Sequence, residues 1–474
     1  MSGGSRANVL PLSVDVDADF FTGGSRNALK RVLASWPLDD VRTWLSDDVG
    51  IALALEEATG KWFPAANSGR AVRDALLAAA TRRGASVHHR ASVEGVRRDG
   101  GRWTVTLADG SERSADALVL STGGLSFPAV GTTGTGHTIA ERTLGHAVAP
   151  PFPALVPLLG AHPGAAHSGA NELAGVSLQT VALRCGEGSK AGRAHRGGFL
   201  FSHKGFSGPS VLDLSHRVVT APRDAQPPLL ADWTGEGRAA WEARLAAPGP
   251  QLAATRLSAH LPARLAAALC AAAGVPPDRR AAELRKDERT RLLDALSAFP
   301  LRVTGDAGFS KAEVSGGGVP LNELRLDTLE SRKAPGVFIC GELVDAFGRI
   351  GGCDTLLQAW HSPCCALTRF YSAASTFFGR GARGGWRAWA RLPRAAGSKR
   401  RSGLLPAGPP KAAPERRDEK AVCTVASHAL AFRIPRLRCQ HATSSTAAQC
   451  RRPRSLGACA PARARAECAR SGSC

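Results

Sequence analysis

The stretch that decides the fold is GVFICGELVDAFGRIGGCDTLLQAW, residues 336–360. It opens with an apolar run, Val337–Cys340, of the kind that forms a strand buried on both faces of a parallel sheet. The run ends at Gly341-Glu342, and a second glycine pair, Gly351-Gly352, precedes a predicted helix that begins near Asp354. The pattern predicts one strand of an α/β sheet that binds a ligand at its carboxyl end.

The residues that follow this strand suit a nucleotide or a flavin. A carboxylate such as Glu342, at the carboxyl end of a strand, can accept hydrogen bonds from ribose or ribityl hydroxyl groups. Free N–H groups at the helix start after Gly351-Gly352 can face a pyrophosphate or the electron-rich edge of a flavin. From the spacing alone, a structural turn in any α/β protein is the alternative interpretation.

A second signal of the same kind lies far upstream. The apolar run Ala117–Leu120 stops at a glycine pair, Gly123 and Gly124, and a helix is predicted to follow over His137–Leu144. Because the two strand-to-glycine signals are so far apart in the sequence, we expect one α/β domain that is interrupted by an insertion. Its first part should also contain a helix over residues 67–84 and antiparallel strands between residues 93 and 110.

The insertion begins where prolines cluster, at positions 150, 151, 153 and 157. Its first half is predicted to form short strands, and residues 235–296 have helical spacing of alanine, leucine and arginine. After Phe309 the α/β character returns with a predicted glycine loop, Gly316–Val319. The expected strands of the insertion are Val176–Leu183, Phe199–Ser202, Ser210–Leu214 and Pro228–Trp233.

These signals divide the chain into four parts. The α/β domain comprises residues 1–149 and 310–375, the insert domain residues 150–309, and a basic tail residues 376–474. The tail holds 21 of the 61 Lys+Arg residues but only 4 of the 40 Asp+Glu residues, so it carries most of the net charge of +21. Because it lacks helical or strand periodicity, we expect it to be disordered.

Composition excludes several other classes of protein. No run approaches the roughly 20 apolar residues of a membrane span, and the N-terminus lacks a secretory signal, so we expect a soluble, by default cytoplasmic, protein. The 12 cysteines form no CxxC and no zinc-site spacing, so we predict reduced thiols and no metal site. Nucleic acid is an unfavoured partner, because only the aromatic-poor tail supports it.

Five segments resemble, in order, the BaiN/aminoacetone-oxidase-like family of FAD-dependent oxidoreductases. SGGSRANV at residues 2–9 is similar to that family's Ser-Gly-Gly-Gly-Arg-Cys-Asn-Val segment, with Ser5 and Ala7 departing. The other four are GKWFP at 60–64, STGGLSFP at 121–128, HKGFSGP at 203–209 and the stretch at 336–360 that ends LQAW. The resemblance covers roughly residues 1–362.

The resemblance implies an α/β, Rossmann-like FAD-binding domain, interrupted by an insert domain with a β-barrel and helices. It also implies an enzyme in which the flavin performs the redox step on a small organic molecule, with NAD(P)H as a candidate electron donor. The family includes reductases of conjugated enones and amine oxidases, so the direction of electron flow stays open. By resemblance, the cofactor-binding residues are Gly3, Gly4, Arg6, Asn8, Gly123, Gly124, Gly341, Glu342, Gly351 and Gly352, and the substrate-side candidates are His203 and Lys204.

The chain departs from the family pattern at both ends. Such a family opens with a strand and Gly-x-Gly-x-x-Gly, which this sequence lacks at the required place, so we expect an N-terminally truncated domain. Near the other end, Pro363 interrupts the family's last helix. An imperfect gene model is one explanation and divergence is the other. The rival hypotheses for function are therefore a pseudoenzyme without bound FAD and a nucleic-acid-binding protein that acts through its tail. No side chain stands out as a catalytic acid or base.

Overall fold

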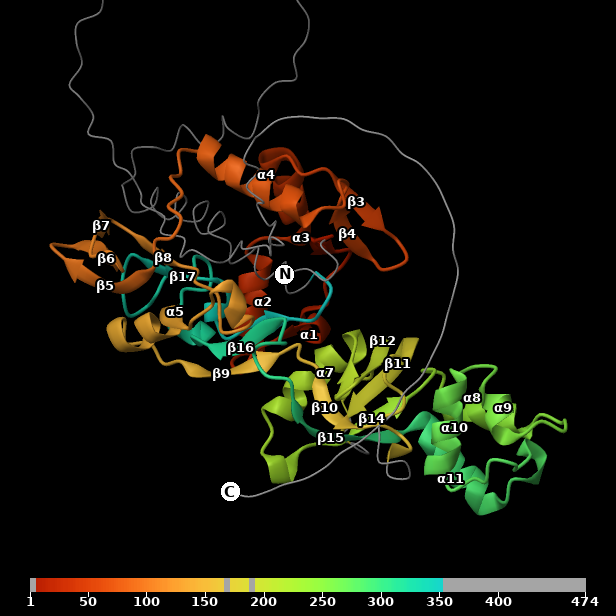
Figure 1. Cartoon of the computed structure of the whole chain (residues 1–474). Coiled ribbons are helices and arrows are strands. Elements are labelled where there is room, and N and C mark those ends of the chain that lie inside the picture. The colour runs from red at the N-terminus through yellow and green to blue at the C-terminus, as the bar shows by residue number, and fades with distance from the viewer. Residues whose placement is uncertain (1–5, 166–170, 187–191, 353–474) are drawn as a thin grey trace, which may run out of the picture. The chain divides into compact units, whose positions relative to one another are not determined.

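The computed structural model describes residues 6–165, 171–186 and 192–352 (Figure 1). The predictions for Gly3, Gly4, the helix near Asp354 and residues 376–474 lie outside the described residues. Within the described part of the chain, no helix combines the length and the apolar character that crossing a membrane requires.

Two parallel strands form the centre of the α/β domain. Strand β8 (Leu118–Leu120) pairs with β17 (Val337–Ile339), with Leu118 opposite Val337 and Leu120 opposite Ile339 (Figure 1). All residues of both strands are buried, as expected for runs that are apolar on both faces. The whole insertion separates these strands in the sequence, so their pairing confirms the interrupted domain.

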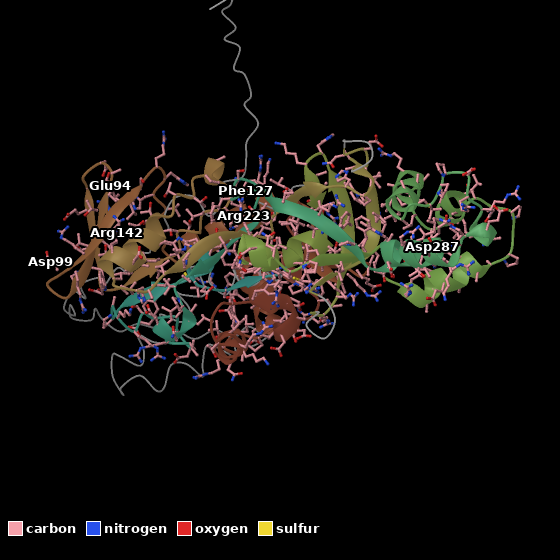
Figure 2. The ribbon with its side chains drawn as sticks, turned by 90° about the horizontal axis from the view of Figure 1, so that it is seen from below. Glu94, Asp99, Phe127, Arg142, Arg223 and Asp287 are labelled. Atoms are coloured by element: carbon pink, nitrogen blue, oxygen red, sulfur yellow. The ribbon has the colours of Figure 1, made fainter. Side chains whose placement is uncertain are left out.

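An antiparallel sheet and a helix complete the predicted part of this domain. Strands β5 (Val93–Asp99), β6 (Arg102–Leu107) and β7 (Glu112–Ala115) pair in sequence order, and Asp99 lies at the β5–β6 turn (Figure 2). Helix α4 (Gly69–Arg82) begins at Ser68, whose hydroxyl accepts the N–H of Ala71. The predicted helix after Gly136 is split into α5 (Thr135–Thr138) and a π-helical turn, Ile139–Thr143.

Short elements surround this centre, and several of them carry residues of the candidate site. Strands β1, β4 and β3 form one sheet, and β18 pairs with β2. The bounds are β1 (Leu10–Pro11), α1 (Val16–Asp19), β2 (Phe20–Phe21), α2 (Arg26–Ala34), α3 (Leu38–Thr43), a π-helical turn (Trp44–Val49), β3 (Leu53–Glu56), β4 (Lys61–Pro64), β18 (Phe347–Gly348) and 3₁₀ turns at Pro128–Val130, Leu321–Glu323 and Gly341–Leu343.

The inserted segment forms a closed six-stranded barrel, as the resemblance implied. Its strands follow the order β10-β13-β12-β11-β14-β15 and leave no unpaired edge. Aromatic side chains fill the interior, among them Phe199, Phe201, Phe206 and Trp233, each at most 1% exposed. The bounds are β10 (Leu158–Ala161), β11 (Ser177–Cys185), β12 (His195–Ser202), β13 (Gly205–Ser207), β14 (Leu229–Asp232) and β15 (Phe299–Asp306).

Helices accompany the barrel, and one of them corrects a sequence prediction. The predicted strand Ser210–Leu214 is wrong, because these residues lie in helix α7 (Pro209–Val219), with Pro209 at its first position. Most of α7 is buried, and a run that is buried on all sides cannot be assigned from periodicity. The predicted helical region contains α8 (Arg238–Ala246), α9 (Ala253–Leu257), α10 (Ala263–Ala272), a 3₁₀ turn (Ala281–Glu283) and α11 (Lys286–Ser297), which carries Asp287 (Figure 2).

The predicted glycine loop at Gly316–Val319 is also wrong. Residues Val314–Gly318 form a fully buried strand, β16, which pairs antiparallel with β9 (Ala149–Ala154). The ring of Phe152 packs where a Cβ of Gly316 would lie, so the glycine permits close packing here. A small apolar cluster links these strands to α7 and β18, through Leu212, Val314 and Phe347.

Candidate functional site

The carboxyl ends of the two parallel strands bring the predicted glycines and acid together. Glu342 Oε2 accepts the backbone N–H of Ser315 at 3.1 Å. A Cβ at Gly124 would lie 2.7 Å from the same oxygen and would also meet the Ser315 side chain. Gly124 is therefore required for the close approach of three segments that are distant in the sequence.

Ser315, which the sequence did not single out, organises the loop after β8. Its hydroxyl oxygen accepts the N–H groups of Leu125 (2.8 Å) and Ser126 (3.1 Å), and it lies 3.0 Å from the hydroxyl of Ser126. Ser315 is 1% exposed. The loop next to Gly123 and Gly124 is therefore held by hydrogen bonds across the domain, and nothing in the sequence around Ser315 indicated this.

A second group of predicted residues meets at Gly351 and Gly352. A Cβ at Gly352 would lie 2.8 Å from Asn8 Oδ1, and one at Gly351 would lie 2.6 Å from Lys61 Nζ. Both glycines have positive φ angles, 112° and 107°, which other residues rarely adopt. The structure thus brings together Asn8 and the glycine pair, and it adds Lys61 from the segment at 60–64.

Arg6 has partners of its own among the described residues. Its Nε donates to Asn67 Oδ1 at 2.6 Å, and its Nη2 lies 3.2 Å from Glu56 Oε1. The guanidinium also lies over the ring of Phe63, 4.2 Å from the ring centroid. Thr59 and Arg6 donate hydrogen bonds to the Glu56 carboxylate and lower its pKa.

Two buried polar atoms in these segments have no hydrogen-bond partner among the described residues. They are Asn8 Oδ1, beside Gly352, and Ser121 Oγ, which directly follows β8. Buried polar groups are nearly always hydrogen-bonded, so each of these oxygens is available to a partner outside the described residues. Both ring nitrogens of His137, after the glycine loop, are likewise buried without a hydrogen-bond partner among the described residues. Burial lowers the pKa of this imidazole.

Asp345 is a buried carboxylate close to the predicted acid, and the sequence did not identify it. It is 6% exposed, and its Oδ2 accepts the N–H of Gly23 at 3.1 Å. Burial raises the pKa of Asp345, and the hydrogen bond from Gly23 partly opposes this. Buried carboxylates with shifted pKa values concentrate at functional sites.

The remaining candidates have other surroundings. Cys340 is 1% exposed, and its Sγ lies 3.5 Å from the carbonyl oxygen of Leu120, which is a packing position. His203 and Lys204 line a cavity of about 510 Å³ at the barrel, together with Arg302 and Asn171. Of the predicted cofactor-binding residues that the structure describes, none lines this cavity.

Metal binding has no support within residues 6–165, 171–186 and 192–352. There, no group of three or more His, Cys, Asp or Glu side chains could hold a metal ion. The glycine pairs and the unpartnered polar atoms suit an organic ligand better than a metal ion.

A parallel strand pair with glycines and an acid at its carboxyl ends, split by an inserted barrel, defines a Rossmann-type nucleotide-binding protein. The family model described as the HI0933-like protein Rossmann domain matches residues 1–368. The chain therefore belongs to this family, the BaiN/aminoacetone-oxidase-like FAD-dependent proteins.

Curated relatives with a described activity cover most of the chain. A ribosomal RNA dihydrouridine synthase of Escherichia coli K12 is 32% identical over 79% of this chain and 89% of its own length. The Haemophilus influenzae protein of the same description is 30% identical over 58% of this chain and 66% of its own length. A 3-dehydro-bile acid delta(4,6)-reductase of Clostridium scindens is 25% identical, over 76% of this chain and 86% of that protein.

Two solved structures overlap only remotely with this chain. A mutant of the FrdA subunit of Escherichia coli quinol fumarate reductase is 14% identical, with a TM-score of 0.35, and the match covers 81% of this chain and 65% of that chain. The Diels-Alderase PyrE3 of pyrroindomycin biosynthesis is also 14% identical, with a TM-score of 0.24, over 82% and 68%. Scores this low carry no argument about the site.

The residues present fit FAD, the cofactor of the family. Glu342 could accept hydrogen bonds from hydroxyl groups, and the unpartnered Asn8 Oδ1 and Ser121 Oγ could bond to the cofactor. Gly351 and Gly352 let this segment pack closely against Lys61 and Asn8, because side chains there would clash with both.

Proposed function

We propose that this protein is an FAD-dependent reductase that saturates a carbon–carbon double bond conjugated with a carbonyl group. One observation carries the proposal: relatives named for two unrelated substrates share one bond change. Dihydrouridine differs from uridine by saturation of the uracil C=C bond that is conjugated with a carbonyl. In a 3-dehydro bile acid, delta(4,6) double bonds are likewise conjugated with the ketone.

The reaction balances with NAD(P)H as the electron donor. A hydride is added to the carbon β to the carbonyl and a proton to the α carbon, while NAD(P)H is oxidised to NAD(P)⁺. Bound FAD would supply the hydride chemistry, and the protein supplies position and electrostatics. The proposal therefore takes the protein to be a reductase and not an oxidase.

We assign cofactor contacts to residues that the structure brings together. Glu342 binds a ribityl or ribose hydroxyl group, and Asn8 bonds to the cofactor beside Gly351-Gly352. Gly123 and Gly124 leave room for the backbone to approach it. The support is the oxygen of Asn8, which has no partner among the described residues, and the close packing of Gly124 on Glu342 and of Gly352 on Asn8, which brings these residues together.

The uracil ring in RNA is the first candidate for the substrate. The two relatives named for ribosomal RNA are 32% and 30% identical, compared with 25% for the bile acid reductase. In the sequence analysis nucleic acid was an unfavoured partner because only the basic tail supported it. That expectation stays untested.

The test begins with the cofactor. The purified chain should release FAD that is quantified from its visible spectrum, and loaded protein should be incubated with NADPH and an unmodified ribosomal RNA transcript. Nucleoside mass spectrometry should detect dihydrouridine, with omission of NADPH as the control. A parallel reaction uses a 3-dehydro-delta(4,6) bile acid. FAD binding without reduction of either substrate overturns the proposal, and a folded chain that binds no FAD supports the pseudoenzyme hypothesis.

A further inference from the structure

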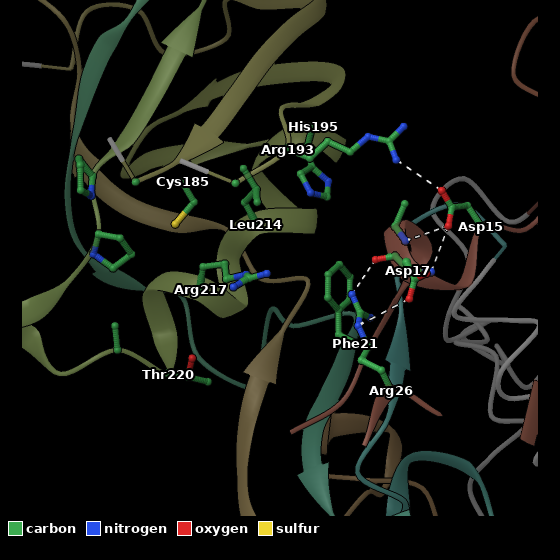
Figure 3. Close-up of a pocket in the computed structure, with 16 residues that line it drawn as sticks. Asp15, Asp17, Phe21, Arg26, Cys185, Arg193, His195, Leu214, Arg217 and Thr220 are labelled. Atoms are coloured by element: carbon green, nitrogen blue, oxygen red, sulfur yellow. Dashed lines mark hydrogen bonds and ion pairs between the residues drawn. The ribbon is translucent and has the colours of Figure 1, made fainter. Parts of the chain in front are cut away.

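A cavity of about 770 Å³ lies between the mouth of the barrel and the first elements of the α/β domain (Figure 3). The barrel side contributes His195 of β12 and Arg217 of α7. The opposite side contributes Phe21 of β2 and the α1 segment with Asp15 and Asp17. The volume suffices for a nucleotide or a steroid-sized ligand.

Arg217 provides an unpaired positive charge in this cavity. Among the described residues, it has no carboxylate within ion-pair distance and no side-chain hydrogen bond. It lies in the last turn of α7, is exposed to solvent, and points its guanidinium into the cavity towards Phe21 (Figure 3). A charged group that the protein leaves unpaired in a concave site is available for a ligand of opposite charge.

The acidic side chains of the cavity do not neutralise Arg217, because each has other partners. Asp15 accepts the N–H groups of Asp17 and Ala18 and lies 3.4 Å from Arg193 Nη1. Asp17 lies 2.7 Å from Lys30 Nζ.

The cavity therefore has a positive field at Arg217. Burial lowers the pKa of His195, and the nearby charges of Arg349, Arg193 and Arg217 lower it further. His195 is thus neutral near pH 7, able to donate or accept a hydrogen bond.

An aromatic surface lies beside the charge. The ring of Phe21 packs on His216, with centroids 4.2 Å apart, and on Phe347, 5.1 Å apart. A planar conjugated ring can stack on such a surface.

The cavity is also adjacent to the segment that carries the glycine pair. Phe21 pairs with Phe347 in β18, and the chain then runs through Ile350, whose N–H donates to Asp213 of α7 at 2.8 Å. Gly351 and Gly352 follow directly. The wall that holds Arg217 and the segment proposed to hold FAD are therefore joined by hydrogen bonds.

We propose that this cavity binds the oxyanion of the substrate, a phosphate or a carboxylate, through Arg217, with the conjugated ring against Phe21. This inference rests on the proposed function, because it identifies the substrate as an anion. Both substrates named for the relatives are anionic, since RNA carries phosphates and a bile acid carries a carboxylate. The guanidinium binds either group with two parallel hydrogen bonds.

The test compares matched charged and neutral ligands on the full-length protein, without turnover. Isothermal titration calorimetry would measure uridine 5′-monophosphate against uridine, and a 3-dehydro-delta(4,6) bile acid against its methyl ester. The wild type should bind the charged member of at least one pair about ten- to hundredfold more tightly. The pair that shows this preference identifies phosphate or carboxylate as the natural group.

Arg217→Gln should abolish this preference. Arg223→Gln removes the same charge from a position that is equally classed as exposed but lies outside the cavity, and it should retain the preference. Both variants lower the net charge by one, and salt screens long-range charge effects in both, so a difference between them reports the local role of Arg217. Circular dichroism checks folding, and Thr220→Glu provides a second variant, because it places a carboxylate in the cavity one turn from Arg217.

The outcomes separate this inference from the proposed function. Equal affinities for charged and neutral ligands in the wild type, or a preference that survives both Arg217→Gln and Thr220→Glu, overturn the anion site. If reduction of a conjugated substrate is nevertheless observed, the proposed function stands alone. If binding depends on Arg217 but no double bond is reduced, the anion site stands and the proposed function fails.

Discussion

Replacing Glu342 tests the centre of the candidate site most directly. In the structure its Oε2 accepts the N–H of Ser315 at 3.1 Å, and Ser315 is 1% exposed. Glu342→Ala leaves that buried donor without this acceptor, which costs about 1–3 kcal/mol of unfolding free energy even without cofactor. If Glu342 also binds a hydroxyl group of FAD, a further charge-assisted bond is lost, worth roughly 1.5–3 kcal/mol, or about a ten- to hundredfold weaker affinity.

Glu342→Gln separates the two roles. Its amide oxygen can still accept the Ser315 N–H, so its unfolding free energy should stay within about 0.5 kcal/mol of the wild type, while the charge is lost. Urea denaturation of the cofactor-free protein measures the first effect, and titration of FAD fluorescence measures the second. A folded Glu342→Ala protein with an unchanged FAD dissociation constant would refute the hydroxyl-binding role, and unchanged stability would refute the role in holding Ser315.

The remaining predictions concern the glycine pair, Asn8 and His216. Gly352→Ala should lower the free energy of unfolding by about 1–3 kcal/mol, because its Cβ would lie 2.8 Å from Asn8 Oδ1. Gly84→Ala, with a similar positive φ but open surroundings, is the matched control in urea denaturation and should cost less. Asn8→Ala should weaken FAD binding about tenfold in the same fluorescence titration while changing the stability of the cofactor-free protein little, because its Oδ1 has no partner among the described residues. A large loss of stability in that variant would contradict this. Burial lowers the pKa of His216 from 6.5 to about 3, so the imidazole is neutral in the folded protein and protonates in the unfolded chain below about pH 6.5. The stabilisation is complete above that pH and is lost as the pH falls towards 3, by about 5 kcal/mol at roughly 1.4 kcal/mol per unit. Urea denaturation measured between pH 7 and pH 4 should therefore show that the free energy of unfolding changes less with pH in His216→Phe than in the wild type. An identical pH dependence of the two proteins would count against this account.

The sequence by itself determined the elements whose signals are local. The buried runs that became β8 and β17 were predicted because strands covered on both faces are uniformly apolar. The β5–β6 turn followed from Gly100-Gly101, and α4 from its apolar spacing and its stop. The strand-to-glycine pattern indicated Glu342 and the glycine pairs of the candidate site, and the family resemblance supplied the barrel and the residues Arg6 and Asn8.

Only the tertiary structure decided the features that depend on distant segments. Residues 210–216 of helix α7 and all of strand β16 are buried, and burial of that kind erases the periodicity that distinguishes helix from strand or loop. Ser315 holds the loop at Gly124, and Asn8 meets Gly352, although no sequence spacing connects either pair. Arg217 is one arginine among many in the sequence, and it becomes a candidate anion-binding residue because folding gives the acids around it other partners. Such contacts are set by the path of the whole chain, which local chemistry does not encode.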